Sequence, residues 1–153
     1  MIEIGQIAPE FSLPRDGAGQ VSLSSCRPSL VVLFFYPRDD TAGCTTEALG
    51  FSNALDAFRS AGTEVIGISK DSVARHDRFR EKHGLAVALA SDAQGTTCED
   101  YGVWKEKQMY GKKFMGIERT TVLIGGDGVI LKIWRKVRVP GHVDDVLQTV
   151  RAL

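Results

Sequence analysis

One apolar run that ends at a proline and a polar turn constrains most strongly how this chain can fold. Residues 29–36 form a continuous run rich in β-branched and aromatic residues, and Pro37 ends it. Such a run is typical of a strand buried on both faces, as in a parallel sheet. The following apolar residues recur near helical spacing: Leu49, Phe51, Leu55 and Phe58. Strand, turn and helix in this order predict an α/β sheet covered by helices.

A single cysteine, Cys44, lies in the polar turn where the predicted helix begins. Thr41, three residues earlier, is placed as the N-cap, and its hydroxyl is expected to meet the backbone N–H of Cys44. The reactive form of cysteine is the thiolate, and an ordinary thiol is only a few per cent ionised at pH 7. This position therefore indicates a reactive thiol rather than a structural cysteine.

The helix N-terminus by itself does not stabilise the thiolate enough to ionise such a thiol, so a nearby cation is also required. It stabilises a nearby anion by about 0.3–1 kcal/mol, less than the roughly 1.4 kcal/mol of one pKa unit. A neighbouring cation contributes about 1–3 units. Arg119 and Arg38 are the candidates. Arg119 opens the apolar segment 120–124, and we expect adjacent parallel strands to bring it beside the Cys44 turn.

The rest of the chain continues the α/β pattern. Short apolar segments flank a turn-rich stretch at residues 15–19, which predicts an N-terminal β-hairpin. Further strands are expected at 64–69, 87–89, 119–124 and 129–134, and helices at 72–83, after Thr96 and at 142–153. Residues 103–118 are expected to form a long loop. With no repeat or linker, residues 1–153 are expected to be one domain.

Charge and cysteine usage exclude several classes of partner. The formal net charge is zero and the pI is about 6.8, so we expect no nucleic-acid and no membrane-surface partner. The start of the chain lacks the pattern of a signal peptide, and no apolar stretch approaches about 20 residues. Three cysteines without a CxxC pair favour a reducing compartment, and the cytoplasm is the expected location.

The residues around Cys44 resemble the signature of a known enzyme family. Pro37, Thr41 and Cys44 match the Pro-x3-Thr-x2-Cys pattern of peroxiredoxins. Four longer segments are similar to the bacterioferritin comigratory protein, or peroxiredoxin Q, subfamily: residues 5–13, 35–47, 105–112 and 116–121. The resemblance covers essentially the whole chain. It implies a thioredoxin-like fold in which the N-terminal β-hairpin is an extension.

The resemblance also implies a thiol-dependent peroxidase and a role for each matched residue. The Cys44 thiolate would attack the terminal oxygen of hydrogen peroxide or an alkyl hydroperoxide and become a sulfenic acid. Arg119 would keep Cys44 ionised and stabilise charge on the peroxide. Thr41 would align sulfur and peroxide, and Pro37 would shield the sulfur from water.

Further expectations concern the rest of the implied site, cofactors and oligomeric state. The backbone N–H groups of Gly43 and Cys44 would bind the peroxide as a small anion-type site. Glu47 would orient Arg119. No cofactor and no metal are needed, and a monomer is expected.

The usual resolving cysteines of the subfamily are missing. Relatives carry one five residues after the peroxidatic cysteine or in the next helix, where this chain has Leu49 and Arg80. We therefore predict a one-cysteine cycle in which an external thiol, glutathione with glutaredoxin or thioredoxin directly, resolves Cys44. Cys98 is an internal alternative, because it lies in a predicted first helical turn and its thiol would be mildly activated. Cys26 is expected to be incidental.

The residues by themselves are also compatible with two functions other than that of a peroxidase. A thioredoxin-like disulfide oxidoreductase would need a CxxC motif, which Cys44 does not begin. A non-catalytic binding module that kept the fold would leave Cys44 with ordinary thiol reactivity. His76 and His83 share one helix face, but no carboxylate or cysteine at a known spacing completes a metal site.

Overall fold

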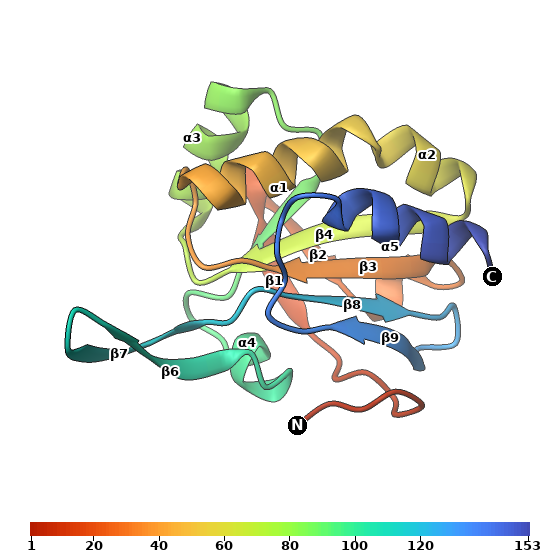
Figure 1. Ribbon diagram of the computed structural model, residues 1–153. Coiled ribbons are helices and arrows are strands. Elements are labelled where there is room, and N and C mark those ends of the chain that lie inside the picture. Colours follow the sequence, from red (N-terminus) through yellow and green to blue (C-terminus); the bar gives the residue numbers. More distant parts are fainter.

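The computed structural model describes residues 1–153 and is built around one mixed seven-stranded sheet with the order β2-β1-β5-β4-β3-β8-β9 (Figure 1). The strands of this sheet are β1 Ser12–Arg15, β2 Gly19–Ser22, β3 Leu30–Phe35, β4 Thr63–Ser69, β5 Ala88–Ser91, β8 Thr120–Ile124 and β9 Ile130–Trp134. The helices are α1 Ala42–Asn53, α2 Leu55–Ser60, α3 Val73–His83, α4 Thr97–Asp100 and α5 His142–Arg151, with short 3-10 turns η1 Asp16–Ala18 and η2 Ser24–Cys26. The predicted α/β class and the N-terminal hairpin of β1 and β2 are confirmed.

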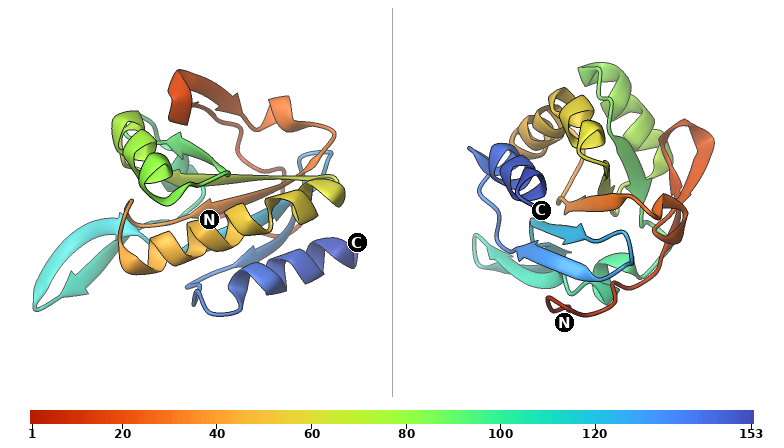
Figure 2. Two further views of the ribbon diagram at one scale, coloured as in Figure 1. Left: turned by 90° about the horizontal axis from the view of Figure 1, so that it is seen from above. Right: turned by 90° about the vertical axis from the view of Figure 1, so that its right-hand side faces the viewer.

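Strand β3 separates two apolar clusters, one on each face of the sheet. Alternate side chains of this strand and the residue after it enter different clusters: Val31, Leu33 and Phe35 enter one, and Val32, Phe34 and Tyr36 enter the other. Helices α1, α2, α3 and α5 cover the second cluster, and the N-terminal segment and α4 cover the first. The long helices lie together on one side of the sheet (Figures 1 and 2). The predicted two-sided burial of the strand is therefore confirmed.

The direction of β8 differs from the expectation. It runs antiparallel to β3, with Phe35 opposite Thr120 and Val31 opposite Ile124, whereas β4 is parallel to β3. The start of β8 therefore lies beside the end of β3. This antiparallel pairing, rather than a parallel one, brings the residue before β8 next to the turn that leads into α1.

The expectation of a loop over residues 103–118 was wrong. The segment forms an antiparallel hairpin of β6 Trp104–Met109 and β7 Lys112–Ile117, which projects from the same end of the molecule as the start of α1 (Figures 1 and 2). Its turn residues Tyr110 and Gly111 both have positive φ, 51° and 77°, as a two-residue type I′ hairpin turn requires. Most of its side chains are exposed, so apolar alternation is weak and the strands were missed.

The helices otherwise follow their sequence signals. Helix α3 begins after Ser72, whose side chain accepts from the backbone N–H of Arg75, and it ends at Gly84 with φ 63°. Helix α5 buries Val146, Leu147 and Val150 against the sheet, while Val143 on the same face is half-buried. No helix is both long and apolar enough to cross a lipid bilayer.

Candidate active site

Cys44 is the third residue of α1 and is 1% exposed. Buried β3 leads into the turn that places it there, and the cysteine packs into the same apolar cluster as Ala48 and Phe51 of α1. Free N–H groups and the positive end of the helix dipole lie at this first turn, an arrangement that favours an anion. The sulfur therefore lies at the helix start and is almost wholly shielded from water.

Arg119 is the cation that reaches the sulfur. Its Nη2 donates to Cys44 Sγ at 3.4 Å, and its Nη1 donates to Glu47 Oε1 at 2.7 Å. Arg38 is exposed, and of the two candidates only Arg119 contacts Cys44. Burial alone would lower the pKa of Arg119, but the nearby Glu47 and Cys44 raise it above its usual value. The guanidinium therefore stays charged and connects the two side chains.

Gly43 makes room for this arginine. A Cβ at Gly43 would lie 3.2 Å from Arg119 Nη2, a closer approach than most side-chain contacts allow. A side chain at position 43 would require the guanidinium to shift by a few tenths of an ångström. Residue 43 therefore has a steric role in addition to the implied contribution of its backbone N–H.

Glu47 is fully buried beside Arg119. Burial raises its pKa from 4.5 to about 7, although the charge and hydrogen bond of Arg119 act in the opposite direction. Its Oε1 accepts from Arg119, while Oε2 is buried without a hydrogen-bond partner. The predicted contact between Glu47 and Arg119 is present, and the carboxyl group changes charge near neutral pH.

Glu47 and His142 are expected to make opposite contributions to the pH dependence of stability. Burial lowers the pKa of His142 from 6.5 to about 4, so its contribution is lost as pH falls through this range. The raised pKa of Glu47, 4.5 to about 7, favours the folded state at low pH, and this benefit is lost as pH rises through that range. Relative to the unmodified protein, the free energy of unfolding of Glu47→Gln should therefore rise by about 3 kcal/mol between acidic and neutral pH.

Urea unfolding at several pH values between about 4 and 7.5 measures this difference. His142→Gln is the matched control, because its relative free energy of unfolding should change with pH in the opposite direction. Parallel pH profiles for Glu47→Gln and the unmodified protein would contradict the assignment of a shifted carboxyl group to Glu47.

Thr41 is the N-cap residue of α1, as predicted, but it does not cap the helix through its side chain. Its hydroxyl donates to the carbonyl oxygen of Arg38 at 2.9 Å and accepts no backbone N–H of the helix. The expected bond to the Cys44 N–H is therefore wrong: the hydroxyl is directed back to the Arg38 carbonyl oxygen within the turn. Pro37 is half-buried directly after β3 and Tyr36, at the start of the same turn.

Cys98 is not an activated thiol. It is 0% exposed, and burial together with the nearby Asp92 raises its pKa well above the usual range. Asp92 Oδ2 accepts from the backbone N–H of Cys98 at 2.8 Å and so takes the anion position at the start of α4. The expected mild activation by this helix was therefore wrong. Cys98 also lies in the apolar cluster on the sheet face opposite to that of Cys44.

The other cysteine and the two usual resolving positions offer no activated thiol. Cys26 is half-buried, and burial raises the pKa of its thiol. Leu49 packs against the apolar cluster that contains Cys44. Arg80 forms an ion pair with Asp16 at 2.6 Å. All three cysteines are free thiols.

Two groups of residues near this site were given no role by the sequence-based prediction. Lys107 of the β6–β7 hairpin is half-buried. Its burial and, to a smaller extent, the charge of Arg119 lower the pKa of Lys107, whereas the nearby Cys44 acts to raise it. Its side chain passes over Gly116, where a Cβ would lie 3.2 Å from Lys107 Cδ. His76 was considered without a carboxylate, yet Asp39 and Asp71 both lie beside it. No local spacing signals either arrangement, because each depends on pairing between distant segments.

Several known proteins are similar to this chain. The model of the AhpC/TSA family matches residues 4–133. The chain is 50% identical over 146 residues to the putative peroxiredoxin Bcp of Coxiella burnetii, which covers 95% of this chain and 97% of that protein. It is 45% identical over 150 residues to peroxiredoxin Bcp of Bacillus subtilis, covering 98% of this chain and 96% of that protein.

Solved structures give the same result. The bacterioferritin comigratory protein of Xanthomonas campestris, described for its alkyl peroxide reduction activity, matches with a TM-score of 0.88 and 43% identity over 93% of this chain and 90% of that one. A variant of Xylella fastidiosa PrxQ matches with a TM-score of 0.93 and 38% identity over 99% and 97% of the two chains. The fold is thus that of a thioredoxin-like peroxiredoxin, a thiol peroxidase among the oxidoreductases. The chain belongs to the AhpC/TSA family and, within it, to the Bcp or peroxiredoxin Q group.

Proposed function

We propose that this protein reduces hydrogen peroxide and alkyl hydroperoxides at Cys44 and that an external thiol completes the cycle. The observation that carries the proposal is the Arg119 guanidinium, which donates to Cys44 Sγ at 3.4 Å at the start of α1. The alkyl substrate class is supported by the activity described for the Xanthomonas campestris relative. The cytoplasm, where thiol reductants are plentiful, is the proposed location, and the monomer the proposed state.

The first half-reaction is a two-electron oxidation of the sulfur. The Cys44 thiolate attacks the terminal peroxide oxygen, the S–O bond forms, and the O–O bond breaks. The leaving alkoxide or hydroxide takes up a proton to become alcohol or water, and Cys44 becomes a sulfenic acid. Arg119 stabilises the thiolate and the charge that develops on the peroxide oxygens, a contribution larger in the transition state than in the ground state.

The turn before α1 supplies the remaining groups of the proposed site. The backbone N–H groups of Gly43 and Cys44 bind the peroxide, and the Thr41 hydroxyl aligns it with the sulfur. Pro37 limits the access of water. Glu47 is the positioning residue for Arg119, supported by the 2.7 Å bond between them.

The second half-reaction needs a thiol from outside the chain. An external thiol attacks the Cys44 sulfenic acid, which releases water and leaves a mixed disulfide, and a second thiol then displaces the first as a disulfide. The positions Leu49 and Arg80 carry no thiol. Cys98 is a poor internal resolver because it is fully buried across the sheet and its pKa is raised by that burial. Glutathione with glutaredoxin, or thioredoxin, is the proposed reductant.

Oxidation with one equivalent of peroxide in the absence of added thiol tests this cycle. We expect a Cys44 sulfenic acid that a dimedone-type reagent traps, and a mixed disulfide at Cys44 once glutathione is added. Mass spectrometry of peptides from both samples measures the two products. A quantitative disulfide between Cys44 and Cys98, together with loss of thioredoxin-driven turnover in Cys98→Ser, would replace this proposal with an internal two-cysteine cycle.

A further inference from the structure

A cavity of about 240 Å³ lies between α3 and the turn that leads into α1. Two acids of the turn and four residues of α3 line it: Asp39, Asp40, Arg75, Arg78, Phe79 and Lys82. Figure 1 shows α3 beside the start of α1. Pockets for drug-sized ligands measure about 300–1,000 Å³, so this cavity fits one end of a small molecule rather than a whole one.

Helix α3 presents its cations to the cavity on a single face. The spacing i, i+3 and i+7 places three of them on one side of the helix: Arg75, Arg78 and Lys82. The exposed acids Asp77 and Glu81 fall on the opposite side of α3, and neither lines the cavity. The wall that α3 contributes is therefore positively charged.

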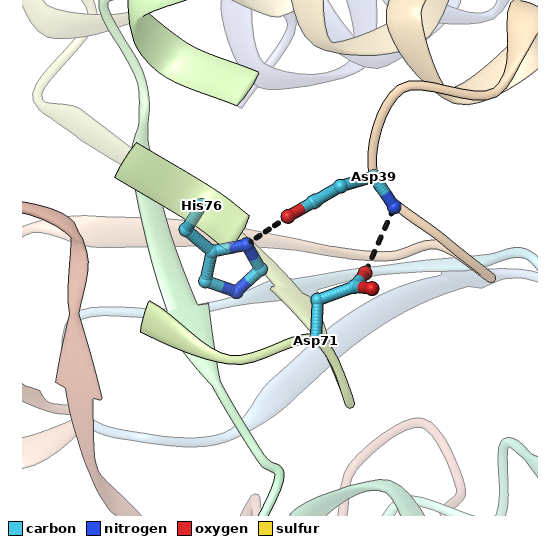
Figure 3. Close-up of side chains that lie close together, drawn as sticks. All are labelled: Asp39, Asp71 and His76. Atoms are coloured by element: carbon cyan, nitrogen blue, oxygen red, sulfur yellow. Dashed lines mark hydrogen bonds and ion pairs between the residues drawn. The ribbon is translucent and has the colours of Figure 1, made fainter. Parts of the chain in front are cut away.

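The acid Asp39, which lines the cavity from the turn, adds no net negative charge. Its Oδ2 lies 2.6 Å from Nδ1 of the buried His76, as Figure 3 shows. His76 Nε2 lies 3.0 Å from the carbonyl oxygen of Ala90, which can only accept, so Nε2 carries a proton. One further proton lies between Nδ1 and Oδ2, because two lone pairs would otherwise face each other. The pair of Asp39 and His76 is therefore neutral as a unit.

Ion pairs neutralise two of the three cations in the α3 wall. Lys82 pairs with Asp40 at 2.7 Å. Arg75 pairs with Asp71 at 3.0 Å, and Asp71 also accepts from the backbone N–H of Asp39, a bond drawn in Figure 3. These contacts hold the walls of the cavity and leave its positive charge to the third cation.

Arg78 is the cation of the cavity that has no partner. It is exposed and takes part in none of the ion pairs of the protein. Arg38, which is also exposed and unpaired, adds a second positive charge in the adjoining turn. A carboxylate would be stabilised here, because the arginine side chain presents several N–H donors in one plane.

The charges of glutathione complement the groups of this cavity. At neutral pH its γ-glutamyl end carries an ammonium and a carboxylate on one carbon atom, and its glycine end carries a second carboxylate. Arg78 can donate two N–H bonds to a carboxylate, and Asp40, whose side chain is 41% exposed, can accept from the ammonium. A simple anion would use Arg78 alone.

The cavity is also close enough to Cys44 to serve the second half-reaction. Four residues separate Asp40 from Cys44, so their Cα atoms lie at most about 14 Å apart. A tripeptide extends over at most about 11 Å and can bridge most of that distance. We propose that this cavity binds the γ-glutamyl end of glutathione through Arg78 and Asp40 and so delivers its thiol to the Cys44 turn, a proposal that rests on the proposed external-thiol cycle.

Substitution of Arg78 tests this site through a ratio of two rates. The timed loss of dimedone-reactive sulfenic acid gives the rate with glutathione and the rate with 2-mercaptoethanol, a thiol without carboxylate or ammonium. The ratio of the glutathione rate to the 2-mercaptoethanol rate should fall about tenfold in Arg78→Ala, because a charge-assisted hydrogen bond is lost. It should fall further in Arg78→Glu, and Arg78→Lys should keep part of it. Arg151→Ala, at an exposed position of α5, is the matched control and should leave the ratio unchanged.

Binding of S-methylglutathione, which has no free thiol, tests the same site without any reaction. Calorimetric titration of the reduced protein should show binding that Arg78→Ala weakens about tenfold and Arg151→Ala does not weaken. An equal ratio of rates in the unmodified protein and Arg78→Glu, or no binding of S-methylglutathione to the unmodified protein, would overturn the proposal. Binding that depends on Arg78 in a protein that forms no sulfenic acid would support the site and contradict the proposed function instead.

Discussion

Cys44→Ser is expected to abolish peroxide consumption. A serine hydroxyl at the start of α1 stays protonated at neutral pH and cannot form a sulfenic acid, so no group at this position can accept the peroxide oxygen. Consumption should fall to the rate of the solution without enzyme. A coupled assay with hydrogen peroxide, and separately with an alkyl hydroperoxide, measures the loss.

The other two cysteines provide matched controls for that result. Cys26→Ser and Cys98→Ser should retain most of the turnover, because neither thiol contacts Arg119, and burial raises the pKa of both. Cys98→Ser places a hydroxyl in a fully buried position, so its thermal stability should be measured beside its activity. Peroxide turnover that survived in Cys44→Ser would show that the reacting thiol lies elsewhere.

Arg119→Ala is expected to reduce the rate of Cys44 oxidation by about 10²–10³-fold, the usual cost of removing one donor to a developing anion. It should also move the pH at which Cys44 becomes reactive toward alkylating reagents upward by about one unit or more, because the neighbouring cation is lost. Iodoacetamide alkylation followed across pH measures the second effect independently of peroxide.

Two companion variants make the Arg119 result interpretable. Arg119→Lys should restore activity only in part, since an ammonium keeps the charge but cannot donate to Cys44 and Glu47 with one planar group. The double variant Arg119→Ala with Glu47→Gln avoids a buried carboxylate without its partner and should keep the activity loss while recovering stability. An unchanged pH profile of alkylation in Arg119→Ala would contradict this role of Arg119 and would show that the helix start alone stabilises the thiolate.

The sequence alone determined the framework around Cys44. The apolar run of β3, the proline after it and the helical period of α1 follow from local rules of burial and dihedral preference, and they place Cys44 at a helix start. The same local rules located the N-terminal hairpin, α3 and α5. These rules did not predict the β6–β7 hairpin, because its strands are largely exposed and its turn uses Tyr110 before Gly111.

Only the tertiary structure decided which distant residues act on that cysteine. Arg119 reaches Cys44 because β8 pairs antiparallel with β3, a choice that the composition of β8 does not encode. The burial that raises the pKa of Glu47 depends on the packing of α1 against the rest of the molecule. The contact between Asp39 and His76 joins a turn to a helix 37 residues away. Local sequence preferences act over a few residues, whereas the charge and position of these groups depend on neighbours that only the folded chain brings together.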